Sequence, residues 1–146
     1  MKRQVTGVGL ALILFGAAGH AQDTQDAAKL IGSWKLVKAV YRGKPLNPNG
    51  QIEIKNVTDS QFMWFKHKEG SSTVTDVGGG PYSVRGDTYS ERLDYGLGND
   101  FKVVKGHVIS LKWKLDGNTW HISGTLNNGL PIEEDWQKLL PQQVGQ

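Results

Sequence analysis

Turn sequences at close intervals constrain the fold of this chain more than any other feature. Gly86-Asp87, Lys105-Gly106, Asp116-Gly117 and Asn127-Asn128-Gly129 separate short segments of alternating apolar and polar residues. Glycine supplies the positive φ that two-residue hairpin turns need, and strands at roughly ten-residue spacing are typical of a sandwich or a barrel. Hairpins join nearest neighbours and closure removes exposed edges, so we predict an all-β, antiparallel up-and-down β-barrel of about eight to ten strands.

The apolar patterns place the expected strands and one short helical turn in a single domain. The helical turn runs over Asp26–Ile31, with Asp26 as N-cap and Gly32 as its stop, and no longer helix is expected after Gly32. The expected strands are, in order, 34–41, a short one around Ile52 and Ile54, 61–68, 73–77, 82–85, 88–95, 101–104, 108–115, 119–126 and 132–139.

The N-terminal segment predicts export. Lys2-Arg3 is basic, Val5–Phe15 is apolar, and Ala17–Ala21 ends with small residues at the positions that signal peptidase reads. The apolar run is shorter than the ~20 residues of a membrane span, and there is no cysteine for a lipid anchor. We expect a periplasmic or secreted protein without an integral membrane segment after cleavage. Its parts would be a signal peptide (1–21), a disordered leader (22–27), the barrel (28–140) and a C-terminal tail (141–146).

Charge and composition argue against several functions. The formal net charge of +3 falls to +1 once Lys2 and Arg3 leave with the signal peptide, and the remaining basic residues are scattered. A nucleic-acid partner is therefore not predicted. His67, His107 and His121 are far apart, which predicts no metal site, and no cofactor is expected. No standard catalytic motif is present.

Four motifs resemble, in order, those of bacterial exported lipocalin-like domains of unknown function, which are calycin-type barrels related to fatty-acid-binding proteins. The motifs are Gly32-Ser33-Trp34, Phe62-Met63-Trp64, Gly79–Val84 with Gly86–Glu91, and Asn128-Gly129 with Glu134-Asp135-Trp136. The resemblance covers roughly Ala28 to Leu140. It implies that Trp34 closes one end of the barrel, a structural role. Gly32, as helix stop, and Gly86, as turn residue, are expected to be structural too.

Strand parity selects the candidate ligand-binding residues. Large apolar residues share a strand face with an occasional polar one, as in a small-molecule cavity. The expected ligand-binding residues are Phe62, Trp64, Tyr89, Glu91, Trp120, Glu134 and Trp136. Two carboxylates among aromatic side chains need donors, either from a ligand or from structural bonds to tyrosine or backbone across the barrel. Strand parity does not decide between a ligand and structural hydrogen bonds as the source of these donors.

Three functions follow from these residues. By analogy with the fold, non-catalytic binding of a small, largely apolar molecule with a polar head is favoured. A small enzyme using Glu91 or Glu134 as acid or base is the second, since burial can raise the pKa of a carboxyl. A filled barrel acting as a protein-interaction module is the third. The state of the barrel interior, open or filled, separates them.

Overall fold

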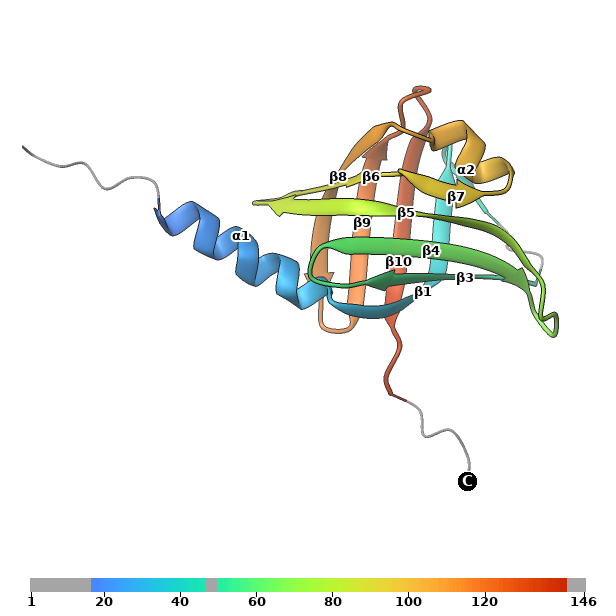
Figure 1. Ribbon diagram of the computed structural model, residues 1–146, viewed down its shortest axis with the longest axis horizontal. Helices are drawn as coiled ribbons and strands as arrows, with labels where there is room; N and C mark the ends of the chain where they lie inside the picture. Colours follow the sequence, from blue (N-terminus) through green and yellow to red (C-terminus); the bar gives the residue numbers. More distant parts are fainter. Residues whose placement is uncertain (1–16, 47–49, 142–146) are drawn as a thin grey trace, which may run out of the picture.

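The computed structural model describes residues 17–46 and 50–141 (Figure 1). Within this part, one ten-stranded sheet closes on itself through the pairing of its first and last long strands, β1 and β10. Eight strands, β1, β3, β4, β5, β6, β8, β9 and β10, follow one another around the barrel in chain order, each antiparallel to its neighbours. The predicted antiparallel up-and-down barrel is confirmed.

The elements have the following bounds. They are α1 (Ala17–Leu30), β1 (Gly32–Tyr41), β2 (Lys44–Pro45), β3 (Gln51–Val57), β4 (Gln61–Lys68), β5 (Val74–Arg85), β6 (Thr88–Arg92), β7 (Tyr95–Leu97), α2 (Asn99–Val104), β8 (Val108–Asp116), β9 (Thr119–Thr125) and β10 (Pro131–Lys138). The short strands β2 and β7 pair at the margins, with β1 and β5 respectively.

Glycine conformation fixes the hairpin at the centre of the chain. Gly86 has φ 54° between β5 and β6, whose Arg85 and Thr88 are paired, so the predicted turn forms as expected. Earlier on β5, the absence of a side chain matters for a different reason. A Cβ at Gly80 would collide with the carbonyl of Arg92, so glycine there lets the end of β6 lie against β5.

The segment 101–104, predicted as a strand, lies instead in the helix α2. Phe101 is buried, and its ring lies against Gly96, while the Asp76 Oδ1 atom accepts a hydrogen bond from the amide of Asp100 at 3.1 Å. A short apolar run can serve as either a strand or a helix turn, and these contacts with β5 and β7 favour the helix. Lys105-Gly106 therefore ends a helix and is not a hairpin turn.

The helix α1 is longer than the predicted turn over 26–31 and includes residues 22–27, which were expected to be a disordered leader. The helix α1 is anchored on the barrel at its end and at its middle, because Leu30 is fully buried and Asp23 Oδ1 accepts a hydrogen bond from the amide of Gly86 at 2.9 Å. Residues 1–16 of the predicted signal peptide and 142–146 of the predicted tail lie outside the described residues. No helix in the described part is long and apolar enough to cross a membrane.

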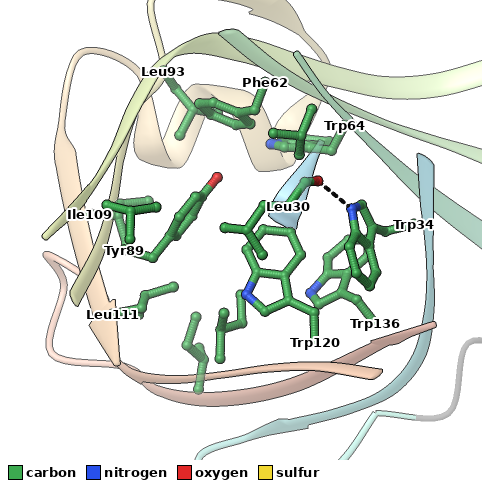
Figure 2. Close-up of a cluster of buried hydrophobic side chains, with 14 of the residues drawn as sticks. Leu30, Trp34, Phe62, Trp64, Tyr89, Leu93, Ile109, Leu111, Trp120 and Trp136 are labelled. Atoms are coloured by element: carbon green, nitrogen blue, oxygen red, sulfur yellow. Dashed lines mark hydrogen bonds between the residues drawn. The ribbon is translucent and has the colours of Figure 1, made fainter. Parts of the chain in front are cut away.

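The two helices lie at opposite ends of the barrel (Figure 1). At the α1 end, Trp34 is completely buried, and its indole N–H donates to the carbonyl of Leu30 at 2.8 Å (Figure 2). Its ring packs edge-on against Trp120, with centroids 5.5 Å apart, and the ammonium of Lys138 lies 5.0 Å from its centroid. The residues at this end thus fill the barrel and close it. Lys138 covers Trp34 with its ammonium, a cation–π contact at the closed end of the barrel.

Candidate functional site

A cavity of about 450 Å³ occupies the other half of the barrel, towards α2. Its wall is mostly apolar and includes Trp64, Leu111, Ile122, Ile132 and Trp136. Leu46, directly after β2, Val103 of α2 and Leu130 of the β9–β10 loop also contribute. Six charged residues also line it, namely Glu53, Lys55, Lys66, Glu91, Asp100 and Glu134. The barrel is therefore filled at one end and hollow at the other.

The structure divides the predicted ligand-binding residues into two groups. Trp64, Glu91, Glu134 and Trp136 line the cavity. The other three, Phe62, Tyr89 and Trp120, are buried in the packed core beyond the cavity wall (Figure 2). Of the residues predicted to be structural, Gly32 and Trp34 lie near the α1 end and Gly86 lies in the hairpin that contacts α1.

Lys55 and Glu91 form a buried ion pair between the core and the cavity. The ammonium Nζ lies 3.1 Å from Glu91 Oε2, and the same oxygen accepts a hydrogen bond from the Tyr89 hydroxyl at 2.9 Å. Lys55 is only 3% exposed. Its Nζ lies 4.9–5.7 Å from the centroids of four rings, those of Phe62, Tyr89, Trp120 and Trp136. Both charges are thus matched by groups of the protein itself, in an aromatic enclosure that favours a cation.

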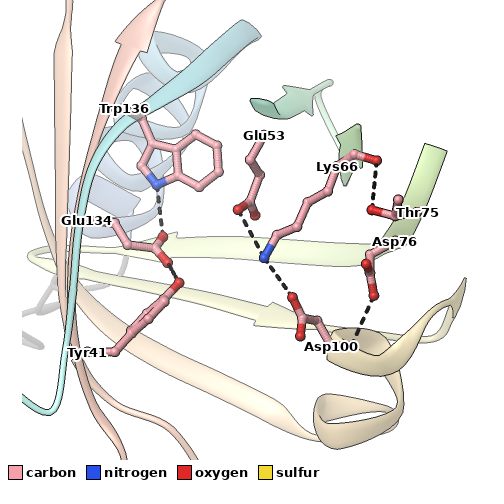
Figure 3. A network of polar contacts seen from close by, with 8 residues as sticks. All are labelled: Tyr41, Glu53, Lys66, Thr75, Asp76, Asp100, Glu134 and Trp136. Atoms are coloured by element: carbon pink, nitrogen blue, oxygen red, sulfur yellow. Dashed lines mark hydrogen bonds and ion pairs between the residues drawn. The ribbon is translucent and has the colours of Figure 1, made fainter. Parts of the chain in front are cut away.

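Glu134 is also buried, but its partners are neutral. Its Oε1 accepts a hydrogen bond from the Tyr41 hydroxyl at 2.6 Å, and its Oε2 accepts one from the Trp136 indole at 3.0 Å (Figure 3). Burial, and then the nearby charge of Glu134, raise the pKa of Tyr41 far above its ordinary value, so this phenol stays a protonated donor. No ammonium, guanidinium or imidazole of the described residues forms an ion pair with Glu134.

Lys66 joins two carboxylates at the mouth of the cavity. Its Nζ lies 3.3 Å from Glu53 Oε2 and 2.7 Å from Asp100 Oδ2, on α2 (Figure 3). Burial raises the pKa of Glu53 to about 7, and the charge of Glu134 adds to this, while Lys66 and Lys55 act in the opposite direction. One ammonium is therefore shared between two acids, and one of those acids changes charge near neutral pH.

Sequence reasoning missed Tyr41, Glu53, Lys55, Lys66 and Asp100. The alternation of Ile52 and Ile54 with Glu53 and Lys55 suggests an apolar inner face, but the charged pair faces inward on β3. Lys66 could have been found, because it continues the face of Phe62 and Trp64 along β4. Their partners come from distant segments, which a single strand pattern does not reveal.

Glu53→Gln is expected to remove a pH-dependent loss of stability. The pKa of Glu53 is higher in the folded state than in the unfolded state, where it is near 4.5. The stability that the protonated Glu53 contributes is therefore fully present below pH 4.5 and is lost as the pH rises through about 7. At pH 8 the variant should be more stable than wild type by about 2–3 kcal/mol, and at pH 4 nearly equal. Urea unfolding across this range measures the difference. The exposed Glu69→Gln is the matched control, and an equally large gain there, or a pH-independent gain in Glu53→Gln, would contradict the assignment.

Within the described residues, no group of three or more His, Asp or Glu side chains is placed to hold a metal ion. The closest approach of a histidine to an acid is that of His121 Nδ1 to Asp135 Oδ1, at 2.7 Å, between β9 and β10. Both side chains are partly exposed to solvent.

Fold and site together define a class of protein, a closed eight-stranded antiparallel β-barrel with an internal cavity that is apolar and acidic. No family model, no curated protein and no solved structure matches the chain. The arguments for function therefore come from the cavity and its residues.

Proposed function

We propose that this chain is an exported lipocalin-like barrel that binds a small, largely apolar molecule with a polar head group. The observation that carries the proposal is the cavity of about 450 Å³. Ligand sites in proteins typically have volumes of roughly 300–1,000 Å³, apolar walls and a few placed polar groups. A barrel that only served as a scaffold would gain stability by filling this space.

The wall suggests how such a ligand would lie. Apolar side chains from β8, β9 and β10, among them Leu111, Ile122 and Ile132, surround the interior of the cavity and suit an aliphatic or aromatic body. Polar atoms of Glu134 and Glu53 offer acceptors to a head group. Export and membership of the lipocalin-like family belong to the same proposal, supported by the N-terminal pattern and the four motifs.

Glu91 is better explained as a structural residue than as a catalytic one. Its Oε2 atom accepts bonds from both Lys55 and Tyr89, which are themselves buried. This supports the structural alternative for Glu91 and favours binding over acid–base chemistry at this residue. The open volume beside it likewise argues against a barrel whose interior is filled.

An uncharged fluorescent probe tests the proposal. N-phenyl-1-naphthylamine should bind the wild type at one site with enhanced fluorescence. Ile122→Trp places a larger side chain in the cavity and should weaken binding at least tenfold, whereas Ser123→Trp, exposed on the adjacent position of β9, should leave it unchanged.

Melting curves of each variant separate lost binding from lost folding, and Leu130→Trp, in the β9–β10 loop at the mouth, provides a second block. Equal affinity in the wild type and in both blocking variants, with all three folded, would contradict binding inside the barrel. A wild type that does not bind the probe would also count against the proposal.

A further inference from the structure

The charges on the cavity wall do not balance. Four carboxylates, Glu53, Glu91, Asp100 and Glu134, face two ammonium groups, those of Lys55 and Lys66. One pair, Lys55 with Glu91, is complete and enclosed by aromatic rings. Lys66 serves both Glu53 and Asp100. The cavity is therefore acidic when its side chains are ionised.

Glu134 is the carboxylate whose surroundings point most clearly to a ligand. It is 8% exposed, it borders the cavity, and its two hydrogen bonds come from a phenol and an indole. A buried carboxylate without a cationic partner is costly in free energy. Each of its oxygens has a second lone pair, so the carboxylate can accept a further donor without losing Tyr41 or Trp136.

Glu53 and Glu134 belong to strands on either side of β1, and both border the same cavity. An ammonium placed between them would donate to both, since it has three donors and no acceptor. The indole of Trp136 lines the same wall, with the ammonium of Lys55 already 4.9 Å from its centroid. An anionic head group would be repelled by the excess of carboxylates on the wall. It would also find no free cation among the described residues of the wall, because Lys55 and Lys66 are already paired.

We propose that the cavity selects a cationic amphiphile, a small molecule with a protonated amine head that pairs with Glu134 and Glu53 and an apolar body that lies against the inner wall. This inference rests on the proposed function and specifies the ligand class for the same cavity. It reverses the polarity expected of a site for fatty acids, in which a cationic side chain would receive the carboxylate.

Three compounds with one body and different heads test the inference by calorimetry, namely 4-phenylbutylamine, 4-phenylbutanol and 4-phenylbutanoate. At pH 8 the amine should bind at least tenfold more tightly than the alcohol, because a charge-assisted hydrogen bond is added, and the carboxylate should bind most weakly. An alcohol or a carboxylate that binds as tightly as the amine would overturn the inference.

Two adjacent positions on β10 give the matched variants. Glu134→Gln should reduce the affinity for the amine about tenfold and leave the alcohol unchanged, whereas Glu133→Gln, exposed on the outer face, should change neither. If Glu134→Gln does not fold, Glu53→Gln takes its place with the same expectation. Equal losses at both β10 positions, or no loss at Glu134 and Glu53, would overturn the assignment of the head group.

The uncharged probe keeps the two proposals apart. Binding of N-phenyl-1-naphthylamine together with a preference for the alcohol or carboxylate would leave the binding function standing and reject the cationic ligand. A wild type that binds neither the probe nor any of the three compounds would reject both.

Discussion

Exchanging Glu91 for Gln is expected to lower the free energy of unfolding by about 3–5 kcal/mol. The substitution keeps the size of the side chain and can keep the hydrogen bond from Tyr89, but it removes the charge opposite Lys55. The ammonium of Lys55 is almost fully buried, so water cannot replace the lost carboxylate. The surrounding aromatic rings stabilise the ammonium of Lys55, but less strongly than a carboxylate at 3.1 Å does. Chemical denaturation of both proteins measures the loss.

A double variant separates the charge from the shape. Lys55→Met with Glu91→Gln removes both charges from the enclosure and should recover most of the stability that Glu91→Gln loses, since a buried ion pair can often be replaced by apolar groups without loss. The exposed pair Asp87 and Lys112 provides the control, and Asp87→Asn should leave the unfolding free energy nearly unchanged. A Glu91→Gln variant as stable as wild type would show that Glu91 does not stabilise Lys55 and would return it to the possible ligand contacts.

The fold could be predicted because it is encoded locally. Glycines in the turns, such as Gly86, and alternation along strands such as β4 and β10 are visible in short windows of sequence. Parity also placed Tyr89 with Glu91, and Glu134 with Trp136, on faces that the structure turns inward. The prediction of a strand over 101–104 was wrong, because a run of four apolar and basic residues fits the period of a strand and that of a helix equally well. Contacts with β5 and β7 stabilise the helix α2 there.

The site could be predicted only in part, because its polar partners are far apart in sequence. Lys55 meets Glu91 across 36 positions and Tyr41 meets Glu134 across 93. Such partners become neighbours only when β1 closes on β10 and the barrel curves β3 towards β6. Parity assigns a residue to the inner face, but it does not tell which inner residues border the cavity and which, like Phe62 and Trp120, pack against other side chains.

Trp34→Ala is expected to cost about 3–5 kcal/mol of stability, a loss on the order of 10–20 °C in melting temperature. The indole is completely buried between α1 and the core, where it contacts Trp120 and donates to the carbonyl of Leu30. Truncation would leave a large void at the closed end of the barrel and a carbonyl without its donor. Trp34→Phe keeps most of the packing, so it should cost only about 1–3 kcal/mol for the lost hydrogen bond.

Trp113 provides a comparison with the same chemistry at a less buried place. Its indole also donates to a backbone carbonyl, that of Gly86, at 2.9 Å, but the residue is only partly buried. Trp113→Ala should therefore cost less than Trp34→Ala. Because Trp34 does not line the cavity, folded Trp34→Ala molecules should still bind the uncharged probe at low temperature. A substitution of Trp136, which does line the cavity, should change the affinity for the probe directly. A loss below about 1 kcal/mol, or a loss of probe affinity in the folded variant, would show that Trp34 belongs to the binding site and not to the closed end.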